Sequence, residues 1–495
     1  MHIMPRTETE NMLYSMWAKR LGHTNFGVTD DFFDVGGTSL VAIDILAELS
    51  KEYEIDVEQF FENNTIEFVA KHLKPNANSM HNKIKGIVTY CEKPQKSPEE
   101  MVLYNQKINS ELTNSDIAVS QKYENILLLG ATGFLGSYLL HTLLKNTSSK
   151  VFVIVRAKDN DSAFERVVKA QQYYFGSRAI KKNTDRLVCL AGDLTVENFG
   201  LAQEVYNTLL KTVDAVLNSA ATVKHIGKSE LFDKTNAGIV REIILFSKGG
   251  KRKAIHHISS IGIVYGEQPD NNRTVFTEYD FNVGQQLKNN YLLSKYHAEE
   301  LLYEARKEGV ETNIYRLSGV MFDSKKGKFQ KNISESSAYV FMKSFYELRI
   351  WPKDFHMMVD ISNVDKIGEA VVKLMMFSSL QNQVYHVINP YIIDMTDIMK
   401  WVGINGDKFK KMSAEEICSY YSENKDNQAI CDLFKQLVFN CEILEPILKN
   451  HYNIEQKKTT ECLERLGFRW SKPTKLSFAK AALYAGSVGF YKAIK

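Results

Sequence analysis

The 495-residue sequence lacks the features that mark membrane, secreted and metal-binding proteins. It has no apolar run of 18 residues and no signal peptide, so we expect a cytoplasmic protein that has no membrane partner. Its six cysteines include no Cys-x-x-Cys pair and no histidine at metal-ligand spacing, which predicts reduced thiols and no bound metal. The formal net charge is only +3, so the composition gives no reason to expect nucleic acid as a partner.

The composition is otherwise that of a soluble globular protein, with 44% hydrophobic and 24% charged residues. A chain of this length is too long for a single core, and length alone predicts about three domains.

The stretch from Asn125 to Gly136 is the most informative part of the sequence. Its four apolar residues, Ile126 to Leu129, are too few for an amphipathic helix and predict a strand buried on both faces of a parallel sheet. Gly130, Gly133 and Gly136 then lead directly into a helix with an apolar stripe. Such a turn lets backbone N–H groups and the positive end of the helix approach a pyrophosphate. The alternative is a turn whose glycines serve only close packing.

Strands and helices alternate after this turn, which predicts a Rossmann-type, doubly wound parallel sheet. The predicted strands are Ile126–Leu129, Val151–Val155, Leu187–Leu190, Ala215–Leu217, Ala254–Ile258 and Thr312–Tyr315. Arg156 follows the second strand, twenty residues beyond Gly136, where NAD-preferring domains have an acidic residue. An arginine there favours the 2′-phosphate of NADP. The alternative is an ordinary surface arginine.

Three polar residues after the fifth strand suggest a catalytic site. Tyr291 and Lys295 are one turn apart on a predicted helix, so their side chains share a face. A nearby cation lowers the pKa of a phenol and makes it a better proton donor or acceptor. Ser260, at the end of the fifth strand, could give a second hydrogen bond to a substrate oxygen. The alternatives are a chance Tyr-x-x-x-Lys and a serine that only ends its strand.

The first eighty residues predict a small helical unit, with one amphipathic helix over Thr9–Leu21 and a second that begins at Ser39. One interpretation of Ser39 is a helix N-cap. However, the segment from Pro5 to Leu73 resembles the carrier (thiolation) domains of nonribosomal peptide synthetases, with the motif Asp34-x-Gly36-Gly37-x-Ser39-Leu40. The resemblance implies that Ser39 carries a covalent 4′-phosphopantetheine arm.

The same resemblance implies several partners. These are a phosphopantetheinyl transferase, upstream adenylation and condensation modules, and an acyl or peptidyl thioester on the carrier itself. The sequence contains no adenylation segment, so we expect either an excised terminal fragment or a carrier that a partner loads in trans.

Residues from about 100 to 390 resemble the thioester reductase domains of the extended short-chain dehydrogenase/reductase superfamily. The matching stretches are Gly130–Gly136, Val155–Ala157, Gly192–Leu194, Asn218–Ala221, Ser259–Ser260, Tyr291-x-x-x-Lys295 and Tyr315–Gly319. The resemblance implies that Ser260, Tyr291 and Lys295 are catalytic. It also implies that NADPH contacts Gly130, Thr132, Gly133, Phe134, Leu135, Gly136, Arg156, Asp193, Leu194, Ser219, Ala220, Ala221, Tyr291, Lys295, Leu317 and Ser318. The family often has Thr at Ser260 and commonly has Pro at Ser318.

The expected architecture is a small all-α four-helix carrier domain followed by an α/β Rossmann-type sheet with a mainly helical C-terminal substrate subdomain. The expected boundaries are 1–76 for the carrier, 77–122 for a linker with a docking helix at Pro98–Leu112, 123–390 for the NADP-binding reductase with a helical insertion near 325–355, and 391–495 for the substrate and carrier-docking subdomain.

The expected function is reductive release, in which NADPH reduces the carrier-bound thioester to an aldehyde. A second reduction to an alcohol stays open. Two alternatives remain: a redox-inactive relative that releases its product by cyclisation, which the presence of Tyr291 disfavours, and a reductase-like module that only docks a loaded carrier.

Overall fold

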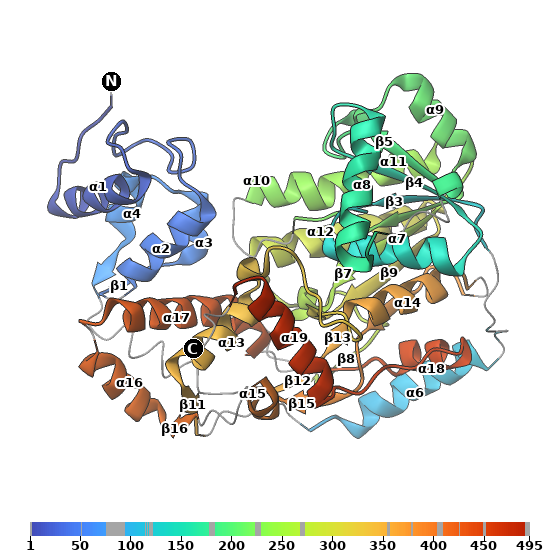
Figure 1. Cartoon of the computed structure of the whole chain (residues 1–495). Coiled ribbons are helices and arrows are strands. Elements are labelled where there is room, and N and C mark those ends of the chain that lie inside the picture. The colour runs from blue at the N-terminus through green and yellow to red at the C-terminus, as the bar shows by residue number, and fades with distance from the viewer. Residues whose placement is uncertain are drawn as a thin grey trace.

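The computed structural model describes residues 2–50, 52–75, 95–113, 115, 117, 122–177, 184–222, 229–267, 273–353, 357–377, 380–402, 409–424, 426–448 and 452–490. Figure 1 shows the N-terminal helices on one side, an open sheet between helices on the other, and a second helical region between them. The predicted linker lies outside the described residues at 77–94, 114, 116 and 118–121.

Side-chain caps set where the four N-terminal helices begin. The helices are α1 (Glu8–Leu21), α2 (Ser39–Leu49), α3 (Val57–Glu62) and α4 (Ile66–His72), and each starts after a residue whose side chain accepts a backbone N–H: Thr7, Thr38, Asp56 and Thr65. Their apolar faces enclose Trp17, Phe32 and Phe60, and a short strand pair, β1 (Tyr53–Glu54) with β2 (Lys74–Pro75), closes the unit. This core contains no residue from beyond Leu73 among those described.

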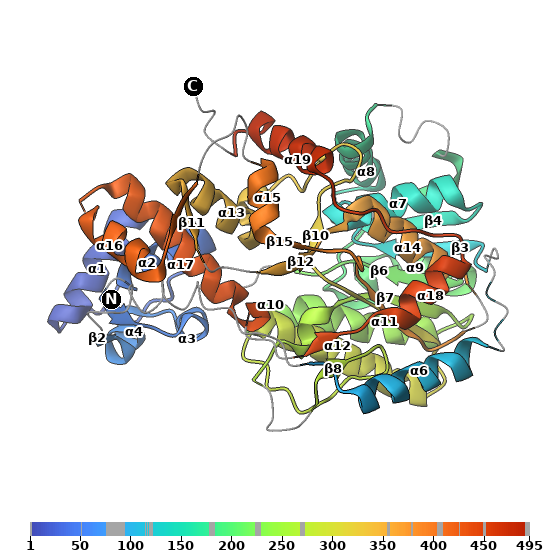
Figure 2. The same cartoon turned by 90° about the horizontal axis from the view of Figure 1, so that it is seen from below.

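Helix α6 (Pro98–Leu112) covers the range in which a docking helix was expected. Ser97 caps it and Pro98 occupies its first turn, where a missing N–H costs nothing. Tyr104, Ile108 and Leu112, four residues apart, are buried in the core of the following domain. Arg465 Nη1 also donates to Leu112 O (2.7 Å), so α6 lies beside α18 (Lys457–Arg465; Figures 1 and 2).

The central sheet has seven parallel strands in the order β14-β9-β7-β6-β3-β4-β5. Six of them are the predicted strands: β3 (Asn125–Leu129), β4 (Lys150–Val155), β5 (Leu187–Ala191), β6 (Ala215–Asn218), β7 (Ala254–Ser260) and β9 (Thr312–Leu317). The seventh, β14 (Val384–Val387), was not predicted. Because the order reverses between β3 and β6, their carboxyl ends form the crevice where such sheets bind ligands.

Helices cover both faces of this sheet. One face packs on α7 (Phe134–Asn146), α8 (Asn160–Phe175) and α14 (Val364–Met375), together with α6 and α18. The other packs on α9 (Gln203–Thr212), α11 (Gly238–Lys248) and α12 (Asn290–Lys307). Burial on both faces explains the continuous apolar runs of β3, β4, β5 and β6.

A second core joins two separate stretches of sequence. The inserted helix α13 (Ser337–Leu348) shares one core with four later helices: α15 (Met395–Val402), α16 (Ala414–Glu423), α17 (Gln428–Leu448) and α19 (Lys475–Ser487). The short strands pair as β11 (Ile350–Pro352) with β16 (Lys410–Met412), β12 (Met358–Asp360) with β15 (Ile392–Asp394), β10 (Val320–Met321) with β13 (Ser362–Asn363), and β8 (Val275–Phe276) with β17 (Asn453–Ile454). Within the described ranges, no helix is long and apolar enough to cross a membrane.

We predict that Ile108→Ala lowers the free energy of unfolding by about 2–5 kcal/mol, because Ile108 is 1% exposed and its truncation leaves a cavity between α6 and the sheet domain. Val102→Ala on the same helix is the control, since Val102 is 54% exposed and should change stability by no more than about 0.5 kcal/mol. Urea unfolding monitored by tryptophan fluorescence measures both. Equal effects of the two variants would contradict the docking of α6.

Candidate active site and carrier attachment site

The glycine turn lies at the carboxyl end of β3 and has room only for glycine at two positions. Gly130 has a φ of +84°, and a Cβ built there would lie 2.7 Å from the Ala220 backbone nitrogen. A Cβ on Gly136 would lie 2.0 Å from Gly130 O. Gly133 is the N-cap of α7 and offers no side-chain cap, so the first N–H groups of α7 keep their capacity to bind an anion. The glycines therefore serve close packing and also leave a cradle that would fit a pyrophosphate.

The ends of β4 and β5 bring Arg156 and Asp193 near each other. Arg156 is exposed directly after β4. Asp193 accepts hydrogen bonds from Thr195 N (2.9 Å) and Thr195 Oγ1 (2.8 Å), and these bonds together with the charge of Arg156 hold the pKa of Asp193 below its usual value. Leu194 packs against the core beneath. The pair thus presents one cation and one anion beside the glycine turn.

The turn after β6 closes the same crevice from the other side. Ser219 Oγ donates to Leu129 O (2.7 Å), so its hydroxyl ties β6 to β3. Asn218 Oδ1 accepts the Ala220 N–H at 3.0 Å. Ala220 and Ala221 are half-buried, and their small side chains leave the crevice open.

Ser260 and Tyr291 are in direct contact, as their predicted roles require. Helix α12 begins at Asn290 after the cap Asn289, which places Tyr291 in the first turn. The Tyr291 phenol is hydrogen-bonded to the Ser260 hydroxyl. Ser260 Oγ also accepts the Gly262 N–H (3.0 Å), which leaves its own proton to be donated.

The pKa of Tyr291 corrects one sequence-based expectation. Lys295 was expected to lower it, but burial raises the pKa of Tyr291 to about 12, and only the hydrogen bond from Ser260 opposes this shift. Desolvation of the phenolate is therefore the main influence on this pKa. Tyr291 is protonated at neutral pH, so the site provides an acid.

Lys295 is buried under the end of β7, where its Nζ donates to Ile258 O (3.1 Å). Burial lowers the pKa of Lys295 to about 8, against the opposing charge of Glu299 one turn further along α12. Glu299 is in turn fixed by Arg316 (Nη2–Oε2 2.7 Å) and by Ser259 Oγ (2.5 Å). Lys295 therefore loses its charge in a pH range close to neutrality.

Two polar groups near the site were not predicted. Asn236 lies in a π-helical turn, Asp233–Ala237, and its Nδ2 donates to Ser294 Oγ (2.9 Å) beside Lys295. Nothing in the sequence pattern indicates this turn, although π-turns are frequent at functional sites.

The other unpredicted polar group is Asp360, which accepts hydrogen bonds from the Ser318 and Ser362 hydroxyls. This contact occupies the hydroxyl of Ser318, and the preceding Leu317 is buried at the end of β9.

The predicted histidine positions are also confirmed. His256 and His257 lie on opposite faces of β7, with His256 against Tyr315 (2.8 Å) and His257 against Asn218 (3.1 Å). Burial lowers the pKa of both, so both are neutral. Their protein partners agree with the expectation that neither is a ligand.

Ser39 is the first residue of α2, and the helix cap is Thr38, whose Oγ1 accepts the Val41 N–H (3.3 Å). The N-cap interpretation of Ser39 is therefore wrong. The side chain of Ser39 itself lies outside the described part of the structure.

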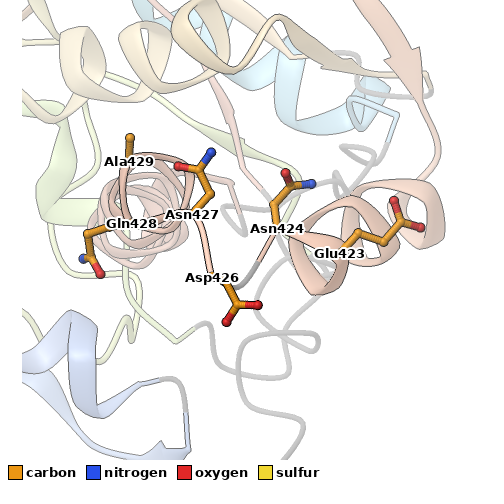
Figure 3. Close-up of a pocket in the computed structure, with 6 residues that line it drawn as sticks. All are labelled: Glu423, Asn424, Asp426, Asn427, Gln428 and Ala429. Carbon is orange, nitrogen blue, oxygen red and sulfur yellow. The ribbon is translucent and has the colours of Figure 1, made fainter.

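A polar pocket of about 580 Å³ lies between α16 and α17, well outside this arrangement (Figure 3). Its lining consists of Glu423, Asn424, Asp426, Asn427, Gln428 and Ala429. None of the predicted cofactor or catalytic residues contributes to it, so it does not mark the active site.

The fold and these residues define a class: a dinucleotide-binding Rossmann domain with a Ser–Tyr–Lys site, preceded by a small four-helix domain with a serine at a helix start. Comparison with known families agrees with this class. Residues 128–371 match the family described as Male sterility protein, and residues 12–73 match the family described as Phosphopantetheine attachment site.

The chain is similar to a linear gramicidin synthase of Brevibacillus parabrevis, with 27% identity over 84% of this chain and 8% of that protein. It is also 27% identical to the L-2-aminoadipate reductase of Saccharomyces cerevisiae, over 74% of this chain and 27% of the reductase. The chain thus spans less than a third of the length of either relative. A thiolation-reductase di-domain from an archaeal nonribosomal peptide synthetase shares its fold, with a TM-score of 0.81, 22% identity, and coverage of 99% of this chain and 100% of that structure.

The two family matches therefore assign a phosphopantetheine-attachment domain to residues 12–73 and an NAD-binding domain to residues 128–371, and the whole chain shares the fold of the thiolation-reductase di-domain.

We predict that a phosphopantetheinyl transferase with coenzyme A adds one arm to the wild-type chain and none to Ser39→Ala, because no other serine follows the Gly36-Gly37-Thr38 turn. Intact-mass spectrometry detects the modification. Thr38→Ala is the control: it weakens the start of α2 by about 1 kcal/mol but keeps the attachment hydroxyl, and should still be modified. An arm on Ser39→Ala would show that the attachment site is elsewhere.

Proposed function

We propose that this protein is an NADPH-dependent thioester reductase, which releases an acyl or peptidyl chain from the phosphopantetheine arm of Ser39 as an aldehyde. The observation that carries the proposal is the hydrogen-bonded pair of Ser260 and Tyr291 next to buried Lys295, in a chain that also contains a carrier. The proposed partners are a phosphopantetheinyl transferase and the adenylation and condensation modules that load the carrier.

The residues present fit a dinucleotide. Its pyrophosphate would lie on the first turn of α7, where a side chain on Gly130 or Gly136 would not fit. Arg156 is exposed and able to pair with a 2′-phosphate, while Asp193 would border the adenosine. The remaining predicted cofactor residues, Thr132, Phe134 and Leu135, are half-buried at the start of α7.

When bound, NADPH supplies the hydride that reduces the thioester carbonyl. Tyr291, held protonated by burial, gives its proton to the carbonyl oxygen as negative charge develops there, and Ser260 donates a second hydrogen bond to the same oxygen. The resulting hemithioacetal then collapses: the Tyr291 phenolate takes back the hydroxyl proton, the C=O bond forms as the C–S bond breaks, the thiolate takes a proton from water, and the aldehyde leaves.

Lys295 supports Tyr291 from one turn along α12. Its ammonium compensates the negative charge left on the phenol after proton transfer, and the bond to Ile258 O keeps its side chain in place. Tethering of the substrate to the carrier makes the encounter effectively intramolecular, which raises the local substrate concentration to the mM range for short flexible linkers.

The first test is Tyr291→Phe, which keeps the ring and removes the acid. We expect NADPH oxidation with a carrier-bound thioester to fall about 10²–10⁴-fold, with NADPH binding retained. Tyr296→Phe on the same helix is the control, because its half-buried ring stacks on Phe281 and should keep near-normal turnover. Wild-type turnover by Tyr291→Phe would show that another group is the acid. A wild type that consumes no NADPH with any thioester would favour the docking-module alternative.

The pH dependence follows from Lys295. Its pKa of about 8 is below the usual lysine value, so the ammonium is present below pH 8 and is lost as the pH rises through 8. We therefore expect kcat/KM for NADPH to fall above about pH 8, while Tyr291, with a pKa of about 12, does not titrate in this range. Steady-state kinetics from pH 6 to 10 measure this decline. A flat profile up to pH 10 would contradict a role for the Lys295 charge.

The cofactor preference is expected to depend on Arg156. Arg156→Ala removes a charge-assisted contact to the 2′-phosphate and should weaken NADPH binding about tenfold or more, with little effect on NADH. Lys158→Ala, which removes a nearby exposed cation, controls for the general loss of positive charge. Titration calorimetry with both nucleotides measures the effect. Equal affinity of the wild type for NADPH and NADH would disprove the assignment.

A further inference from the structure

The carrier contacts the reductase through two glutamates. The first is Glu48 on α2, whose Oε2 lies 2.5 Å from Lys435 Nζ on α17. Lys435 is only 5% exposed, and its other acidic partner is Asp432 on its own helix (3.4 Å). In Figure 1, α17 runs directly beneath the carrier helices. The carrier thus supplies the carboxylate nearest to this nearly buried cation.

The second glutamate, Glu62, ends α3 and contacts the starts of two reductase helices. Its Oε1 accepts the Ser229 N–H (2.7 Å) at the start of α10 (Ser229–Phe232) and Asn290 Nδ2 (2.7 Å) at the start of α12. Its Oε2 accepts the Ser229 hydroxyl at 3.2 Å. All three donors are neutral N–H or O–H groups, so the Glu62 carboxylate makes charge-assisted hydrogen bonds with them. Asn290 directly precedes Tyr291, so this contact places the carrier next to the turn that holds the proposed acid.

The chemistry of these contacts is that of a reversible interface. Among the described residues, the carrier core consists of carrier side chains alone, so the carrier has its own core apart from the reductase. The Glu48 side chain is 31% exposed even in the docked arrangement and can be hydrated when the carrier leaves. Contacts that involve charged groups set the orientation of two docking partners and speed their association, and these contacts weaken as the salt concentration increases.

We propose that Glu48–Lys435 and Glu62 on the starts of α10 and α12 form the docking interface that holds the loaded carrier at the active-site entrance and releases it to the modules that load it. The proposal rests on the proposed reductase function and adds to it the surface that the carrier recognises.

The test uses the full chain with an octanoyl-phosphopantetheine arm transferred to Ser39 from octanoyl-coenzyme A, and it measures single-turnover NADPH oxidation. Glu48→Lys and Lys435→Glu each place like charges together and should slow this reaction at least about fivefold. The double variant Glu48→Lys/Lys435→Glu restores the opposite charges and should recover to within about twofold of wild type. A double variant no faster than the single variants would overturn the pairing, since only a real contact is rescued by exchange.

Glu62→Gln tests the second contact and keeps the shape of the side chain. We expect slower single turnover and faster hydrogen exchange at the Ser229 amide, which mass spectrometry detects directly. Glu8→Gln, the same change at an exposed position of α1, is the matched control and should affect neither. Unchanged exchange and unchanged turnover in Glu62→Gln would overturn the role of Glu62.

Free octanoyl-pantetheine separates failure of this proposal from failure of the proposed function. In a Ser39→Ala background, the Glu48, Lys435 and Glu62 variants should reduce this untethered thioester at the same rate. Normal reduction of the free thioester, combined with tethered rates that do not respond to these variants or to salt, would overturn the docking interface and leave the reductase assignment intact. If the wild type reduces neither thioester, the reductase function itself fails.

Discussion

The buried ion pair of Arg316 with Glu299 holds α12 on the sheet. Both side chains are fully inaccessible, and Arg316 binds both carboxylate oxygens of Glu299 while also donating to Asp280 O (2.7 Å). A buried charge without its partner is strongly unfavourable, so the pair fixes the distance between α12 and β9. The same carboxylate accepts Ser259 from β7. The positions of Lys295 and Tyr291, one and two turns earlier on α12, therefore depend on this contact.

The other parts of the site lie at the carboxyl ends of the sheet strands, next to α12. The carboxyl ends of β3, β4, β5 and β6 supply the cofactor side of the crevice, and the carboxyl end of β7 supplies Ser260. The second helical core reaches the glycine turn through Phe134, whose ring contacts Phe329 (5.2 Å between ring centroids). It also provides α17, the helix against which the carrier packs. The glycine turn, Tyr291 and the carrier helices are thus positioned by three separately packed units.

The sequence predicted most of the sheet because of one physical constraint. A parallel strand covered on both faces is usually a nearly continuous apolar run, and β3, β4, β5 and β6 each have one, while β7 and β9 keep apolar residues beside buried polar ones. The missed strand β14 is a four-residue edge strand that contains His386, whose Nδ1 is bonded to Glu455 O (2.6 Å). No period or run of apolar residues indicates such a strand. Likewise, nothing in the sequence around Asn236 indicates the π-turn that directs it to Ser294.

The sequence by itself determined the order of the two domains, the glycine turn, the docking helix and the identity of the Ser–Tyr–Lys residues, because each depends on local spacing or on a short motif. Only the tertiary structure decided the protonation of the site, since burial rather than the neighbouring cation controls the pKa of Tyr291 and lowers that of Lys295. It also decided that Thr38 caps α2 and that Glu48 and Glu62 meet the reductase. Desolvation and contacts between residues far apart in the chain depend on the packed surroundings, which a linear pattern of residues does not contain.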